Sequence, residues 1–220
     1  MKKFKTFTSL IILFIASSVS AKDFGLHFDD SGNIIKPDQE FMWRGMDDEK
    51  DGFRNSAFKN FKRAAEFGNY HAMSLVALYL MQDKDYQSAH AWFKLIDLGK
   101  IPNREYMEEI VGNLETMMSP QELQQADDMK AELAETYGSY PTMLRRAEWK
   151  NSLKFTGTHI KGYIPPFLRI QLNSGMEITG QNLKKQIETF IYDYEFNFGV
   201  GEVTLDEIEI IEADETEEKK

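Results

Sequence analysis

The chain has 220 residues, carries 36 Asp and Glu against 26 Lys and Arg, and contains no cysteine. This acidic balance argues against nucleic acid as a partner, because phosphate binding needs a basic surface. The lack of cysteine excludes disulfides, thiol catalysis, thiolate metal sites and a lipidated cysteine anchor.

Residues 1–21 have the pattern of a cleavable secretory signal peptide of bacterial style. Basic residues at the start precede an apolar run from Leu10 to Ala16, and small residues lead up to Ala21. We expect cleavage after Ala21 and a periplasmic or secreted protein, with no membrane insertion afterwards. An uncleaved anchor is the weaker alternative, because the apolar run is shorter than the roughly 20 residues that span a bilayer.

The N-terminal segment, residues 22–52, predicts a hairpin followed by a first helix. Apolar residues at 26–28 and 34–35 flank the turn sequence Asp-Ser-Gly-Asn, which favours a β-hairpin. We expect a helix to begin within the stretch from Pro37 to Met46.

Residues 53–140 show helical periodicity. Ser119, Pro120 and Glu122 have the pattern of a capping box with proline in the first turn. Glycine follows several of the expected helices, as is typical of helix ends. Apolar residues at helical spacing predict helices over 53–68, 70–81, 86–98, 103–118 and 120–137.

Alanine and phenylalanine recur with a period of 32 residues in this region. Ala57 is followed by Ala89, and Phe61 by Phe93, at that spacing. A period of this size indicates paired helices that bury their apolar faces by stacking on their neighbours.

Residues 141–211 predict a small α+β extension. Free strand edges in it offer a route to self-association, so a homo-oligomer is an alternative to a monomer. Residues 212–220 are highly charged, and we expect them to be disordered. The expected elements of the extension are a helix over 143–149, strands over 167–172 and 176–178, a helix of about 16 residues capped by Thr179, and a strand over 203–211.

Residues 57–100 resemble the Sel1-like repeats, which are relatives of the tetratricopeptide repeat. The strongest match is the stretch 64–72, Ala-Ala-Glu-Phe-Gly-Asn-Tyr-His-Ala, and the pattern weakens after Gly99. The loop 81–85 is shorter than the loop usual in the family and lacks glycine. The matching positions with a packing role are Ala57, Phe61, Ala64, Ala65, Gly68, Ala72, Leu75, Leu78, Tyr79, Ala89 and Phe93.

The resemblance implies a mainly α fold, a short α/α solenoid of Sel1-like repeats carrying the C-terminal β-hairpin–helix–strand extension. It also implies that the groove of the stacked hairpins binds a protein or peptide in the cell envelope, with no cofactor and no reaction. Trp92 and Phe93 have a competing interpretation as core residues. The expected contact positions, exposed or half-exposed in such a groove, are Tyr70, His71, Met73, Ser74, Tyr86 and Trp92.

We therefore expect a non-enzymatic exported scaffold or adaptor, without catalytic residues or a metal. The acidic runs lack the order of a calcium loop. The histidines His27, His71, His90 and His159 lack the spacing of metal ligands. The alternative is an envelope enzyme or ligand-binding protein with a site between the repeats and the extension, lined by Asp193, Glu195 or His159.

Overall fold

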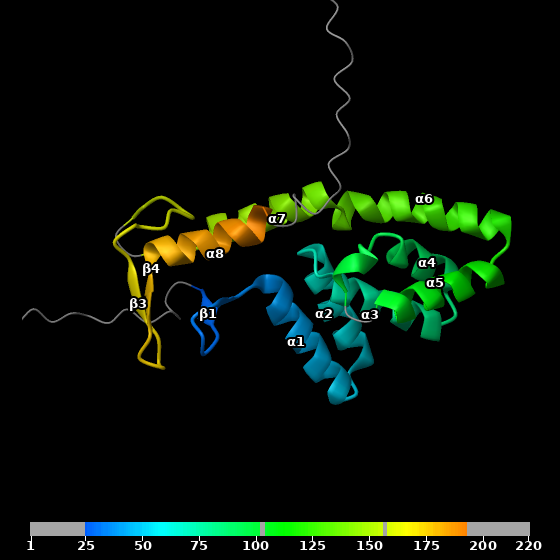
Figure 1. The fold of residues 1–220 in the computed structure, drawn as a ribbon, viewed down its shortest axis with the longest axis horizontal. Coiled ribbons are helices and arrows are strands. Elements are labelled where there is room, and N and C mark those ends of the chain that lie inside the picture. The colour runs from blue at the N-terminus through cyan, green and yellow to red at the C-terminus, as the bar shows by residue number, and fades with distance from the viewer. Residues whose placement is uncertain (1–24, 102–103, 156–157, 193–220) are drawn as a thin grey trace, which may run out of the picture.

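The protein is elongated, with a helical body at one end and small β-hairpins at the other (Figure 1). This computed structural model describes residues 25–101, 104–155 and 158–192. Within them the mainly α fold is confirmed, since the strands form only two short hairpins, and no helix has the length and apolar character to cross a membrane. Outside them lie the predicted signal peptide (1–21), last strand (203–211) and acidic tail (212–220).

Four helices follow one another and pack in sequence. Each contacts the next along the chain, so they form two adjoining helical hairpins. Gly68, at φ +79°, makes the reversal between the second and third helices. The four helices are α1 (Pro37–Lys50), α2 (Arg54–Glu66), α3 (Tyr70–Gln82) and α4 (Tyr86–Phe93).

The fourth helix ends earlier than the sequence predicts. Periodicity favours a helix over 86–98, but α4 ends at Phe93, because the Ile96 N–H turns back to the Phe93 carbonyl at 3.1 Å. A short 3-10 turn, Leu98–Lys100, follows. Ile96 is buried all the same, so the apolar spacing continues although the helix does not.

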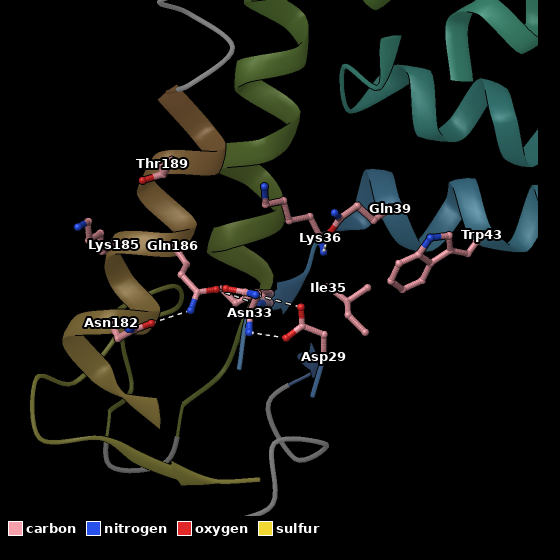
Figure 2. Close-up of a pocket in the computed structure, with 11 residues that line it drawn as sticks. Asp29, Asn33, Ile35, Lys36, Gln39, Trp43, Asn182, Lys185, Gln186 and Thr189 are labelled. Carbon is pink, nitrogen blue, oxygen red and sulfur yellow. Dashed lines mark hydrogen bonds between the residues drawn. The ribbon is translucent and has the colours of Figure 1, made fainter. Parts of the chain in front are cut away.

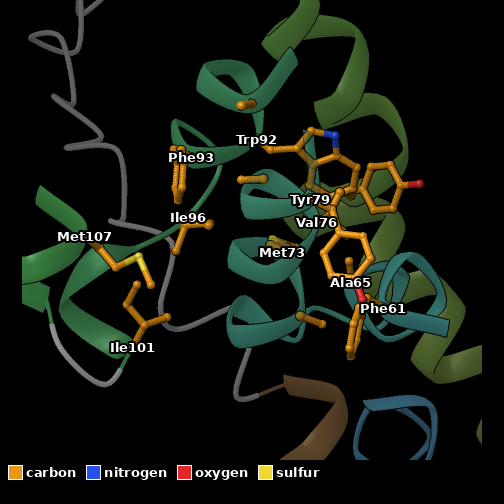
Figure 3. Packing of buried hydrophobic residues seen from close by; sticks show 14 of the residues in the cluster. Phe61, Ala65, Met73, Val76, Tyr79, Trp92, Phe93, Ile96, Ile101 and Met107 are labelled. Atoms are coloured by element: carbon orange, nitrogen blue, oxygen red, sulfur yellow. The ribbon is translucent and has the colours of Figure 1, made fainter. Parts of the chain in front are cut away.

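The helices enclose a hydrophobic core that we call the repeat core (Figure 3). Alanines let the helices approach closely, and aromatic rings fill the space between them. Phe61 is fully buried, and its ring meets Tyr79 edge-on at a centroid distance of 5.8 Å. Leu75 and Leu78 are only partly buried against this core. The predicted packing residues that it buries are Ala57, Phe61, Ala64, Ala65, Ala72, Tyr79, Ala89 and Phe93.

The next two helices do not repeat the hairpin arrangement. Both α5 (Arg104–Met117) and α6 (Pro120–Tyr137) contact α4, but they make little contact with each other. The predicted capping box of α6 is present: Ser119 Oγ accepts from the Glu122 N–H at 3.3 Å, and the Glu122 carboxylate accepts from the Ser119 N–H at 2.8 Å. α6 therefore covers α4 without forming a third hairpin with α5.

α7 (Ser139–Ser152) follows α6 almost without interruption. It is longer than the predicted 143–149 and begins as soon as Gly138 breaks the helical backbone with a ψ of 179°. The two helices run end to end along one side of the molecule (Figure 1). α7 thus leads the chain from the repeat core to the hairpins.

Two hairpins and the last helix form a second, smaller unit, which we call the β module. β1 (His27–Phe28) pairs antiparallel with β2 (Ile34–Ile35), β3 (Arg169–Gln171) with β4 (Glu177–Thr179), and α8 (Gly180–Tyr192) completes it. The N-terminal hairpin therefore packs with the C-terminal extension, a pairing that the order of segments along the chain does not show. The core of the module consists of Leu26, Ile34, Leu153, Phe155, Ile164, Ile170, Ile178, Leu183, Ile187 and Ile191.

Candidate functional site

The residues predicted to contact a partner do not form one exposed surface. Met73, Ser74 and Trp92 are buried, with 0%, 1% and 4% of their surface exposed, so the exposure expected of them is wrong. α2 and α4 pack on α3, and Trp92 packs on Tyr137 of α6 at a ring-centroid distance of 4.4 Å. The competing expectation, that Trp92 and Phe93 fill the core, is confirmed.

The remaining predicted positions are only partly available. His71 is exposed, whereas Tyr70 and Tyr86 are half-buried and pack against the repeat core. The Nζ of Lys100 lies 6.0 Å from the centroid of the Tyr70 ring. At the predicted positions, α3 and α4 thus offer one well-exposed side chain.

A hollow of about 530 Å³ lies where α1, the β1–β2 hairpin and α8 meet (Figure 2). This is the junction between the repeat core and the β module, where the alternative site was expected. His159 does not line it, and Asp193 and Glu195 lie outside the described residues. The lining residues come from two distant segments, 29–43 and 182–189, so no local motif marks the hollow.

Hydrogen bonds fix the hairpin wall of the hollow. Asp29 accepts hydrogen bonds from the side-chain amide of Asn33 at 3.0 Å and from its backbone N–H at 2.8 Å. Both bonds lower the pKa of the Asp29 carboxyl, and the side-chain bond has the larger effect. Gln186 of α8 accepts from the Ile34 N–H at 2.7 Å and donates to the Gly32 carbonyl at 3.1 Å. One side chain therefore joins the α8 wall to the hairpin wall.

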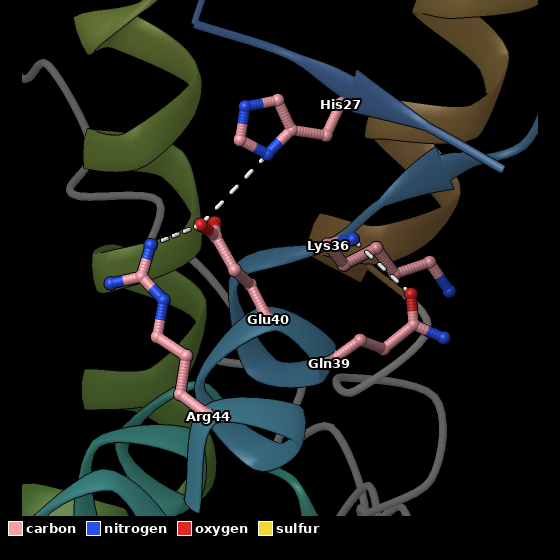
Figure 4. A network of polar contacts seen from close by, with 5 residues as sticks. All are labelled: His27, Lys36, Gln39, Glu40 and Arg44. Atoms are coloured by element: carbon pink, nitrogen blue, oxygen red, sulfur yellow. Dashed lines mark hydrogen bonds and ion pairs between the residues drawn. The ribbon is translucent and has the colours of Figure 1, made fainter. Parts of the chain in front are cut away.

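A polar network ties the start of α1 to the same hairpin (Figure 4). Glu40 accepts a hydrogen bond from Arg44 one turn further on, and its carboxylate lies 3.9 Å from Nδ1 of His27 in β1. Gln39 Oε1 accepts from the Lys36 N–H at 3.2 Å, which closes the first turn of the helix. Because His27 and Arg44 are well exposed and Glu40 is only half-buried, we expect these charged groups to orient α1 more than they stabilise the fold.

Two side-chain amides in the lining of the hollow have an oxygen that already accepts a hydrogen bond, so each amide offers its N–H groups as donors. The oxygen of Gln39 accepts from a backbone N–H, and that of Asn182 accepts from Gln186 at 2.6 Å, which leaves their amide N–H groups for a ligand. Lys36 and Lys185 also line the hollow, together with Asp29, and the Nζ of Lys36 lies 5.5 Å from the centroid of the Phe190 ring. Such a donor set suits an oxygen-rich, negatively charged group.

An aromatic face completes the hollow. Trp43 of α1 lines it, is 49% exposed, and directs its indole toward the hairpin (Figure 2). An exposed indole beside amide and ammonium donors can hold an apolar group and a polar group of one ligand at the same time.

A poorly hydrated carboxylate lies in the first turn of α1, next in sequence to the lining residue Gln39. Asp38 Oδ2 accepts from the side-chain amide of Asn69 at 3.2 Å, whereas its Oδ1 is buried and has no hydrogen-bond partner in the part of the chain that the structure describes. Burial raises the pKa of the Asp38 carboxyl, and the positive charges of Arg146 and Lys36 offset only part of this effect.

Asp38→Asn is expected to raise the free energy of unfolding at neutral pH. The pKa of the Asp38 carboxyl is higher in the folded state than its ordinary value of 3.8. The contribution of Asp38 to stability is therefore largest below pH 3.8, and it falls as the pH rises through the pKa of the folded state. The advantage of asparagine should therefore vanish near about pH 3. Guanidinium unfolding at neutral and acid pH measures it.

Asp29→Asn is the control for this prediction, since its parent carboxyl has a lowered pKa. The Asp29 carboxylate stabilises the folded protein above its ordinary pKa, and this effect is lost as the pH falls. Asp29→Asn should therefore be less stable than the parent protein at neutral pH. A loss of stability in both variants at neutral pH would contradict the assignment for Asp38.

The histidine of α4, His90, is buried and contacts a carboxylate of α5. His90 Nε2 lies 3.1 Å from Glu115, which Lys94 also contacts at 2.9 Å. Hydrogen bonds lower the pKa of the Glu115 carboxyl, and the bond from Lys94 has a larger effect than the bond from His90. Over residues 25–101, 104–155 and 158–192, no group of histidine, aspartate and glutamate side chains could hold a metal ion.

No protein-family model, curated protein or solved structure matches this chain. The resemblance of residues 57–100 to Sel1-like repeats therefore stays a prediction from the sequence. The junction hollow and α1 beside it are the features of the described fold that bear on what the chain binds.

Proposed function

We propose that this chain is a non-enzymatic binding protein of the bacterial cell envelope, which holds an acidic peptide segment of a partner protein along α1. The observation that carries the proposal is the half-exposed indole of Trp43 in the lining of the junction hollow. Met46, one turn further along α1, is 50% exposed. Side chains three positions apart are neighbours on a helix, so the two extend the hollow as an apolar strip.

The lining of the hollow supports a peptide as the ligand. The amide N–H groups of Gln39 and Asn182 suit the carbonyl groups of an extended backbone, and Lys36 and Lys185 suit acidic side chains. Trp43 is the kind of residue that dominates the binding energy of protein interfaces. We place the contact on α1, because only one of the positions first expected on α3 and α4 is well exposed.

The helical packing supports the scaffold role. α1 is held by α2 over its length and by the Glu40 network at its start, so its exposed face is presented on a rigid support. A rigid support lowers the ordering cost of binding. The envelope location rests on the signal-peptide pattern of residues 1–21.

Site-specific crosslinking in cells tests the proposal. A photo-crosslinking residue at position 43 or 46 is expected to label the same acidic segment of one partner, and a crosslinker at Tyr106, an exposed aromatic position on α5, is expected to leave that segment unlabelled. Labelling of different proteins from positions 43 and 46, or equal labelling from position 106, would contradict it.

Charge reversal in the hollow sharpens this test. Lys185→Glu should weaken binding of the labelled segment roughly 3- to 10-fold, because it places a negative charge where the acidic segment lies. Lys184 is the matched control, since it neighbours Lys185 on α8 but does not line the hollow. Equal effects of the two reversals would show that general surface charge, and not the hollow, controls binding.

A further inference from the structure

The loop between α7 and β3 exposes large apolar side chains at one tip of the molecule. Ile160, Tyr163 and Phe167 are 66%, 48% and 92% exposed, and Phe167 is the most exposed large apolar side chain in the described part of the chain. The loop lies at the end of the molecule that carries β3 and β4, away from α4, α5 and α6 (Figure 1). Nothing in the described fold covers these side chains.

The loop is held in place by hydrogen bonds and by a buried anchor. Tyr163 N–H donates to the Ile160 carbonyl at 3.3 Å, and Leu168 N–H donates to the Pro165 carbonyl at 3.0 Å, so two turns follow each other. Between the turns, Ile164 is buried in the core of the β module. A fixed backbone that turns apolar side chains outward differs from a loop whose side chains are simply unpacked.

The charge around the loop is the reverse of that of the whole chain. No aspartate or glutamate occurs between Glu148 and Glu177, in a chain with 36 acidic residues. The same stretch contains Lys150, Lys154, His159, Lys161 and Arg169. An anionic surface is therefore the complementary partner.

We propose that residues 158–168 dock this protein peripherally on an anionic phospholipid bilayer. Tyr163 and Phe167 suit the boundary between headgroups and acyl chains, where aromatic side chains are enriched. Lys161 and its basic neighbours suit the lipid phosphates, as in polybasic membrane-binding segments. The proposal goes beyond the binding of a peptide along α1 and does not depend on it.

A bilayer fits these observations better than an acidic protein does. The apolar side chains project from turns, and none of the loop residues lines the junction hollow. A protein partner would have to supply its own pocket for Phe167. A bilayer accepts projecting apolar side chains without one.

Sedimentation with lipid vesicles tests the proposal. The chain should start at Lys22, because the apolar run of residues 10–16 would itself enter a bilayer, and every described contact involves residues from 25 onward. We expect binding to vesicles of equal parts phosphatidylglycerol and phosphatidylcholine, little binding to phosphatidylcholine alone, and loss of binding in about 0.5 M NaCl. The variant with both Ile160→Ser and Phe167→Ser should bind roughly tenfold more weakly.

Tyr106→Ser is the matched control, since Tyr106 is 59% exposed but lies on α5 between Glu105 and Glu108. It should leave vesicle binding unchanged, and thermal unfolding should show that all variants are folded. Failure of the chain to bind anionic vesicles, or equal binding by the double serine variant, would overturn the proposal. A peptide with the acidic sequence of residues 202–218 serves as a probe for a protein partner. If the loop binds this peptide and does not bind the vesicles, the proposal is overturned in favour of an acidic protein segment.

Discussion

Replacing Arg146 with alanine is expected to lower the free energy of unfolding by about 3–5 kcal/mol. Arg146 is 6% exposed, and its guanidinium donates to the carbonyls of Phe67, just after α2, and Phe190, near the end of α8. It also lies 4.2 Å from the centroid of the Phe190 ring. Alanine would remove these donors from both carbonyls and would take a positive charge away from the neighbourhood of Asp38.

The loss should separate the unfolding of the two units, because Arg146 joins the repeat core to the β module. Trp92 packs in the repeat core, and Trp149 meets Phe190 of α8 edge-on at 5.6 Å, so the two indoles report on different units. Two reporter variants are compared, each of which carries Trp43→Phe and keeps only one of these two indoles. When Arg146 is present, the fluorescence of both reporters should show unfolding at the same denaturant concentration. With Arg146→Ala, the Trp149 transition should move to the lower denaturant concentration.

Arg145→Ala is the control for this prediction. Arg145 donates to the carbonyls of Glu66 at 2.7 Å and Thr136 at 3.2 Å, which belong to α2 and α6, and no described hydrogen bond takes it to α8. We expect a loss of about 1–2 kcal/mol, with the two fluorescence transitions still coincident. A loss from Arg146→Ala that shifts both transitions equally would contradict the linking role of Arg146.

The sequence predicts the local elements because local chemistry sets their ends. Ser119 begins α6 through a capping box, and Thr179 accepts from the Asn182 N–H at 3.3 Å where α8 begins. The predicted start of α7 is late, because Pro141 looks like a break between segments. It lies in the first turn of α7, where a missing N–H costs the helix no hydrogen bond.

The junction between the two units could not be predicted in the same way. Gln186 and Ile34, whose hydrogen bond closes one wall of the hollow, are 152 residues apart in the chain. Arg146 has no motif that distinguishes it from Arg145 beside it, and only the tertiary fold shows which of the two spans the units. The exposure of Trp43 likewise follows from where α8 and the hairpin lie, and not from its spacing in α1.

Gly180→Ala is expected to destabilise the β module by about 2–3 kcal/mol. A Cβ at this position would lie 2.1 Å from the carbonyl oxygen of Pro165 and 3.2 Å from the Cβ of Leu168. The contact with Pro165 is with the backbone, which moves less easily than a side chain. The Gly180 N–H also donates to the Leu168 carbonyl at 2.7 Å, so moving the two backbone segments apart would break that hydrogen bond. In guanidinium unfolding, the Trp149 transition should shift more than that of Trp92.

Gly112→Ala is the matched control, since a Cβ there would meet nothing within 4 Å on α5. It should stabilise the protein by about 0.5–1 kcal/mol, as alanine does in a helix interior. Pro165 and Leu168 form the second turn of residues 158–168, the loop proposed to dock on the bilayer. Gly180→Ala should therefore also weaken binding to anionic vesicles, although no exposed side chain is changed. Full vesicle binding by a destabilised Gly180→Ala variant would mean that the loop docks without the fixed backbone inferred for it.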